Sequence, residues 1–189
     1  MTEFVMMGIL PDIAHGLQIS IPQAGYLITA YALGVVVGAP TLVTIVAGRP
    51  PRTVLIWFML MFAVFNAMSA FAPNFETMMA SRFLAGLPHG AFFGVGAVVA
   101  SRLAEPGKTA AAMAMMFTGL TLANVLGVPL GTWIGHAFDW RMVFLIVAVI
   151  GLLTMWSLYQ WVPPIAPSKR TGLMQDLRIF RHLDLWLAL

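Results

Sequence analysis

Five apolar stretches follow one another along the chain, and short polar connections separate them. The hydrocarbon core of a bilayer requires roughly 20 apolar residues in a helix, and each of the five is long enough to cross it. The pattern predicts membrane spans near residues 23–47, 54–71, 76–100, 109–134 and 141–162. Because a spanning segment must satisfy its own backbone hydrogen bonds, the chain is predicted to be an all-α integral membrane protein.

Both ends of the chain carry shorter apolar segments. Residues 1–10 are apolar but too few to span, and Pro11 is predicted to end them. We expect this segment to be the outer part of an incomplete first helix, so that residues 1–162 form a six-helix bundle. A short interfacial segment is the alternative. Residues 184–189 are predicted to open a seventh transmembrane helix, and we expect the chain to be cut at both ends.

The stretch 163–183 is predicted to be a linker. Pro163 and Pro164 stop the preceding span because proline cannot continue a helix. Beyond them, apolar residues recur at helical spacing among basic ones, which favours a short amphipathic helix on the membrane surface over a plain charged linker. The apolar positions are Leu173, Leu177 and Phe180.

Basic residues are distributed unevenly among the connections. Alternate connections hold eight of the ten basic residues, the other connections hold only Arg141, and Arg82 lies inside a span. Basic loops remain in the cytoplasm, so the asymmetry orients the bundle and predicts a cytoplasmic linker and a bacterial inner-membrane protein. The eight are Arg49, Arg52, Arg102, Lys108, Lys169, Arg170, Arg178 and Arg181.

Composition narrows the function further. The chain is 60% hydrophobic and 9% charged, which is far from a soluble composition. Its net charge of +3 is explained by the cytoplasmic loops, so no nucleic-acid surface is predicted. The chain has no Cys and therefore neither disulfides nor thiolate metal sites. No phosphate-binding loop, nucleophile elbow or paired-His motif occurs, so we expect no enzyme activity, no cofactor and no metal.

Glycines recur every fourth residue in three spans, and each span also contains a proline. Such a stripe lets neighbouring backbones approach closely, so tight packing alone is one interpretation. Three stripes combined with three prolines favour helices that also slide or bend, as in a transporter. Gly127, Pro129 and Gly131 are the predicted hinge, forming a flexible seam with the span 23–47. The other positions are Gly34, Gly38, Pro40, Gly86, Pro88, Gly90, Gly94 and Gly135.

Two charged residues are predicted to lie within the membrane. Glu3 precedes Pro11 by eight residues, which is roughly 12 Å along a helix and near the bilayer centre. A carboxylate is costly there, which makes Glu3 a candidate proton carrier. If the natural chain began at Met1, Glu3 would lie in water. Arg82 cannot lose its charge, so it requires polar partners or a water-filled cavity; otherwise it snorkels outward.

Several polar residues in the spans are candidates for a substrate cavity. His89 could bind substrate or relay protons, or it could bond the carbonyl that Pro88 leaves free. The other candidates could line the cavity or form ordinary hydrogen bonds between helices. They are Asn66, Asn124 and Tyr31.

Motifs in the expected order resemble one transporter family. The first segment ends in a Glu3-to-Pro11 stretch, and Arg49-Pro-Pro-Arg52 lies in the connection between the second and third helices. Arg82-Phe-Leu-Ala-Gly-Leu-Pro-His-Gly begins an arginine motif in the fourth helix. The run Gly119-Leu-Thr-Leu-Ala-Asn-Val-Leu-Gly-Val-Pro-Leu-Gly follows in the fifth, and then Asp139-Trp-Arg. Together they resemble the N-terminal half of a major facilitator superfamily transporter, in the drug:proton antiporter branch that includes arabinose and sugar-efflux permeases.

The resemblance implies a fold and a function. It implies proton-coupled efflux of a small organic solute, such as a sugar or drug, by alternating access against a C-terminal six-helix half. It assigns proton coupling to Arg82, with Glu3 as acidic partner, and a gate loop to Arg49 and Arg52. A facilitative or uptake transporter of the same fold, or a non-transporting six-helix membrane protein, is the alternative.

Four positions depart from the family pattern, and one of them is Val128, which lies between the glycine and the proline of the fifth-helix motif. Thr44 and Gly48 stand where the gate-loop signature has glycine and aspartate, so the charge relay of that loop is in doubt. Met7 occupies the position where drug-efflux relatives often carry an acid. The acid of this chain, Glu3, lies one turn further inward on the same face.

Overall fold

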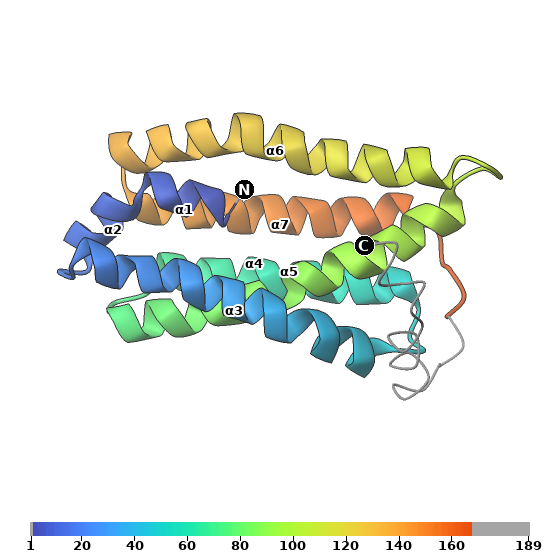
Figure 1. The fold of residues 1–189 in the computed structure, drawn as a ribbon, viewed down its shortest axis with the longest axis horizontal. Coiled ribbons are helices and arrows are strands. Elements are labelled where there is room, and N and C mark those ends of the chain that lie inside the picture. The colour runs from blue at the N-terminus through green and yellow to red at the C-terminus, as the bar shows by residue number, and fades with distance from the viewer. Residues whose placement is uncertain (1, 168–189) are drawn as a thin grey trace, which may run out of the picture.

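The computed structural model describes residues 2–167, which form a bundle of helices lying side by side (Figure 1). Two short helices lead into five long ones, and the chain runs up and down the bundle. Within the described residues the helices are α1 (Phe4–Gly8), α2 (Leu10–Gly16), α3 (Ile21–Val46), α4 (Pro51–Ala70), α5 (Phe75–Leu103), α6 (Thr109–Ala137) and α7 (Trp140–Trp161).

The five long helices are the five predicted spans. Each is long and apolar enough to cross a membrane, and each agrees with its predicted bounds within a few residues. The all-α membrane fold is therefore confirmed. Local signals fix the ends: Ser20 and Gln23 form a reciprocal cap on α3, Asn74 caps α5, and Asp139 caps α7.

The prediction that Pro11 ends the first apolar segment is wrong. The helical path breaks earlier, at Ile9, and α2 then continues through Pro11 to Gly16. Pro11 lies in the first turn of α2, where a helix does not need the amide hydrogen that proline lacks. The segment therefore extends further toward the outer surface than the proline suggested.

Helices α3 and α5 pack backbone against backbone. A Cβ atom placed on Gly34 would lie 2.1 Å from the carbonyl oxygen of Phe83, and one on Gly86 would lie 2.3 Å from that of Tyr31. Gly38 meets the Leu87 carbonyl in the same way. These glycines are required by the close approach, as predicted for small-residue stripes. The approach holds Tyr31 of α3 beside the interior face of α5.

Helix α6 is the least buried long helix, and it lies along one side of the bundle (Figure 1). Two of its glycines, Gly131 and Gly135, do not form the predicted seam with α3. Gly131 contacts Val5 of α1, and Gly135 contacts Ile9, while Val143 of α7 lies beside both. The prediction failed because a glycine stripe specifies a close neighbour without specifying which helix that neighbour is.

Helix α7 ends at Trp161, and Val162 to Pro167 have no helical structure, so the proline stop is confirmed. The amphipathic linker helix and the start of a seventh span were predicted mainly for residues 168–189. Those predictions lie outside the described residues.

Candidate functional site

Arg82 is completely buried in the middle of the helical packing, and it is the largest fully buried side chain. The interpretation that it snorkels outward is therefore excluded. Its Nη1 lies 3.3 Å from Oδ1 of Asn66 and 3.4 Å from Oγ1 of Thr2, and its Nη2 lies 3.4 Å from the Thr2 carbonyl oxygen. Thr2 in turn donates to Asn66 over 3.0 Å. These are long hydrogen bonds to neutral groups.

Aromatic ring faces complete the surroundings of Arg82. The guanidinium carbon lies 4.4 Å from the ring centre of Tyr31 and 5.3 Å from that of Phe144. Cations are attracted to such faces, most strongly where water is excluded. The Nε of Arg82 is buried and has no hydrogen-bond partner among residues 2–167. The charge is thus held by Thr2, which precedes α1, together with α3, α4 and α7, and one donor is unsatisfied.

Glu3 lies next to Thr2 in the sequence and is half-buried. No ion pair within 4 Å joins its carboxylate to Arg82 in the part of the chain that the structure describes. The structure therefore brings the predicted acidic partner to the edge of the cluster, while neutral groups make the direct contacts.

Tyr31 connects this cluster to His89. The Tyr31 hydroxyl and the Nδ1 of His89 share a hydrogen bond of 2.6 Å, and their rings are 5.6 Å apart. His89 also lies 5.4 Å from the ring of Phe93, which stacks on Phe117 of α6 at 6.4 Å. The partner of His89 is thus a tyrosine on a neighbouring helix.

His89 and Tyr31 border a cavity of about 560 Å³ inside the bundle. This volume falls within the usual range for small-molecule sites. The polar groups at its surface are few and the remainder of its wall is apolar. The polar lining residues are Thr2, Tyr31, His89 and Thr154, and the apolar ones are Met59, Phe62, Pro88, Phe92, Phe93, Met116, Gly119, Leu120, Ala123, Val147 and Ile150.

The other two predicted cavity residues lie elsewhere. Asn66 is fully buried in the Arg82 cluster, where its Nδ2 also donates to the Phe62 carbonyl over 2.8 Å. Asn124 lies on α6 away from the cavity wall, and its buried Oδ1 has no hydrogen-bond partner within the described chain. Of the four candidates, His89 and Tyr31 are therefore brought together, and Asn66 joins them through Arg82.

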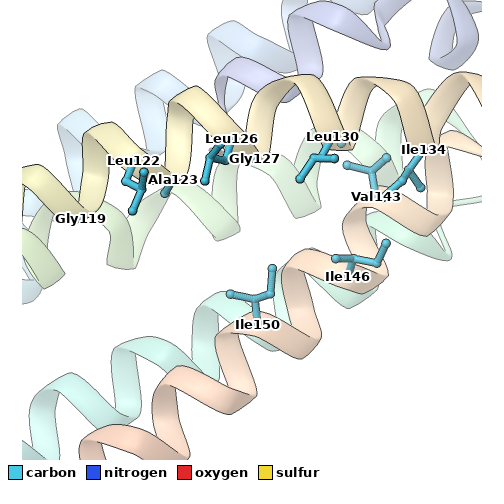
Figure 2. Close-up of a pocket in the computed structure, with 11 residues that line it drawn as sticks. Gly119, Leu122, Ala123, Leu126, Gly127, Leu130, Ile134, Val143, Ile146 and Ile150 are labelled. Carbon is cyan, nitrogen blue, oxygen red and sulfur yellow. The ribbon is translucent and has the colours of Figure 1, made fainter.

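A second, open groove of about 480 Å³ separates α6 from α7. Figure 2 shows that side chains from both helices face it, and all of them are apolar. Gly127 and Gly131, two of the predicted hinge residues, lie along its α6 wall, whereas Pro129 is exposed. Helix α6 therefore has open space along the face that carries the glycines.

Comparison with known proteins identifies the family. The family model of the Major Facilitator Superfamily matches residues 1–189. The chain belongs to this superfamily of transporters. It is 46% identical to the inner membrane transport protein YdhP of Escherichia coli strain K12 over 188 residues, and 42% identical to the putative transporter AraJ of the same strain over 187 residues.

The major facilitator relatives are longer than this chain. The YdhP and AraJ alignments cover 100% and 99% of the chain but 48% of each relative. An uncharacterized transporter of the superfamily from Bacillus subtilis strain 168, YfhI, is 43% identical over 96% of the chain and 46% of its own length. The chain thus spans about half the length of the curated relatives that it matches, and corresponds to their N-terminal half.

The loop between α3 and α4, predicted to be a gate, contains no aspartate to which its arginines could bind. Gly48 adopts a left-handed conformation with φ +80°, which suits glycine, and Arg49 is exposed. Arg52 instead donates from Nη2 to the carbonyl oxygen of Tyr159 on α7, and it stacks over the Tyr159 ring at 5.1 Å. The two predicted gate residues therefore have different surroundings.

Sequence reasoning missed Thr2 and the aromatic residues of the site. Thr2 contacts Arg82 and lines the cavity, yet it sits beside the more conspicuous Glu3. Phe93 follows His89 by one helical turn, a spacing that places both on one face, and this signal could have indicated it. Phe144 gave no signal because its contact with Arg82 depends on tertiary packing.

Proposed function

We propose that this chain forms the N-terminal bundle of a proton-coupled exporter of small organic solutes. The observation that carries the proposal is the fully buried Arg82, whose charge is held in the bundle interior by neutral partners beside a cavity. Burying a permanent charge in the membrane interior costs free energy unless polar partners compensate it. A charge that is buried with incomplete compensation therefore indicates a function. Here the compensation is incomplete, because the Nε of Arg82 lacks a partner among the described residues.

Glu3 supplies the proton site in this proposal. Glu3 is half-buried and follows Thr2, whose hydroxyl and carbonyl already contact the guanidinium. A deprotonated Glu3 is attracted to Arg82, whereas a protonated Glu3 is not. Proton uptake therefore changes the local attraction between α1 and α5, and this supports a role in switching between conformations.

The Tyr31–His89 hydrogen bond links the charged cluster to the solute. The ring of Tyr31 lies under Arg82 and its hydroxyl reaches His89, which borders the cavity. A movement of Arg82 would therefore displace Tyr31, and through Tyr31 it would displace His89 at the cavity wall. In this proposal His89 contacts the solute, and the apolar wall accepts the rest of it.

The full transport cycle requires a second six-helix bundle. In the proposal, solute and protons cross a bacterial inner membrane as the two bundles alternate access to the site between them. The relative YdhP is an inner membrane transport protein, and this supports the location. The glycine face of α6 along the open groove supports movement of that helix, with Gly127, Pro129 and Gly131 as the hinge.

Glu3→Gln tests the proposal in the protein expressed from its complete gene. Purified protein is placed in proteoliposomes containing a pH-sensitive dye, and proton movement is recorded on adding pentoses or cationic dyes. We expect at least one solute to drive proton flux in the wild type. We expect Glu3→Gln to abolish the flux because the amide cannot carry a proton, while folding stays intact by gel filtration.

Glu76→Gln is the matched control, because Glu76 is exposed in the first turn of α5. It is expected to transport like the wild type. Undiminished ΔpH-driven transport in Glu3→Gln would remove Glu3 from the mechanism.

Facilitated diffusion is the second candidate. It is favoured by the finding that no ion pair joins Arg82 to a carboxylate within residues 2–167. A protonophore distinguishes the two functions, since it stops proton-driven export from cells and leaves facilitated flux unchanged.

A further inference from the structure

Helices α4 and α7 are antiparallel, and they pack together over much of their length. In the middle of the pair, a Cβ on Gly151 of α7 would lie 3.3 Å from the side chain of Ala63 of α4. Each helix begins with an arginine at its second position, Arg52 in α4 and Arg141 in α7. Because the helices are antiparallel, each arginine lies near the end of the other helix.

Each arginine donates to a carbonyl at the carboxyl end of its neighbour. Arg52 donates to the Tyr159 oxygen in the last turn of α7, and Arg141 donates from Nη2 to the Ala72 oxygen, 3.1 Å away, just beyond α4. The Tyr159 carbonyl is one of the last carbonyls of α7, which have no partner within the helix and carry its partial negative charge, whereas Ala72 lies in the turn that follows α4. Arginine is a suitable donor because its planar group also stacks on aromatic rings.

Both contacts are reinforced by such rings. Arg52 stacks over Tyr159 at 5.1 Å, and Arg141 stacks over its own neighbour Trp140 at 4.2 Å. Asp139 also accepts a hydrogen bond from the Arg141 backbone over 2.7 Å, which fixes the start of α7. The Asp139-Trp140-Arg141 motif thus has a structural use at this end of the pair.

We infer that Arg52 and Arg141 are reciprocal positioning residues that join α4 and α7 into one rigid unit. Apolar surfaces of two helices gain little from meeting inside a membrane, because lipid tails are equally apolar. The arginine hydrogen bonds at the two ends therefore contribute much of the preference of α4 and α7 for each other. The inference also explains Arg141, the basic residue that the positive-inside pattern leaves on the outer side. It does not depend on proton coupling.

Hydrogen exchange in the detergent-purified protein tests the inference end by end. Arg52→Gln is expected to speed amide exchange in the last turn of α7, residues 158–161, by about five- to tenfold, as for loss of one charge-assisted hydrogen bond at a partly exposed site. Exchange at the end of α4, residues 67–72, should not change. Arg141→Gln should produce the opposite pattern.

Two further variants separate the loss of the Arg52 hydrogen bond from the loss of a basic charge. Arg49→Gln removes a basic charge from the same loop at an exposed position and should change neither end. Arg52→Lys keeps the charge that orients the loop but loses the planar group, so it should fold with an intermediate increase at α7. Unchanged exchange at the neighbouring helix, or an equal increase at both ends, would overturn the inference.

Discussion

Helices α5 and α6 both carry glycine at every fourth position, yet they meet their neighbours differently. On α5, Gly86 lies against the backbone of α3, with the Tyr31 carbonyl oxygen 2.3 Å from where a Cβ would be. On α6, Gly131 lies against the side chain of Val5 and also lines an open groove. The first contact leaves no space to adjust, whereas the second involves a side chain that can be shortened. The same sequence pattern therefore serves fixed packing in one helix and a looser contact in the other.

Gly86→Ala gives the largest expected effect. The added methyl would meet a backbone carbonyl, so α3 and α5 must separate, at a cost of about 3 kcal/mol in the free energy of unfolding. Thermal unfolding of the purified protein in detergent measures this. Gly94→Ala is the control, because nothing lies within 4 Å of its Cβ position two turns along the same helix. It should be neutral or slightly stabilising, and equal losses in both variants would show that the α3–α5 approach is not tight.

Gly131→Ala has a smaller expected effect. Its methyl would lie 2.5 Å from Cγ2 of Val5, and the higher helix propensity of alanine offsets part of the strain, leaving a loss of about 1 kcal/mol. Because the obstacle is a side chain, Gly131→Ala should cost less stability when Val5 is also replaced by alanine, although Val5→Ala by itself loses buried packing. The same unfolding assay applied to the single and double variants checks this. If Gly131→Ala costs as much stability in the Val5→Ala protein as in the wild type, the looser contact is contradicted.

The spans and the position of Arg82 within one of them could be predicted from sequence because they depend on local pattern, whereas its burial was left open against outward snorkelling. Hydrophobic length predicted the bounds of the five long helices, and Arg82 stood out as the basic residue within a span. The contacts of Arg82 could not be predicted in the same way. Thr2, Asn66 and Phe144 come from three other elements, and no periodicity says which faces meet.

Two errors have the same origin. Pro11 was taken as a stop, although proline is compatible with the first turn of a helix that begins just before it. The α6 glycine face was assigned to the wrong neighbour, α3 in place of α1. Each local signal was real, but the consequence of Pro11 depended on where the helix begins, and that of the α6 glycines on which segment packs against them.

The most direct test of the account is solute-driven proton flux in proteoliposomes that contain Arg82→Gln in the protein expressed from its complete gene. Glutamine keeps a polar side chain at this position but removes the buried charge that we propose responds to Glu3. The account predicts that proton flux is lost while exchange of solute across the membrane at equal concentrations persists. Proton flux at the wild-type rate in Arg82→Gln would contradict it.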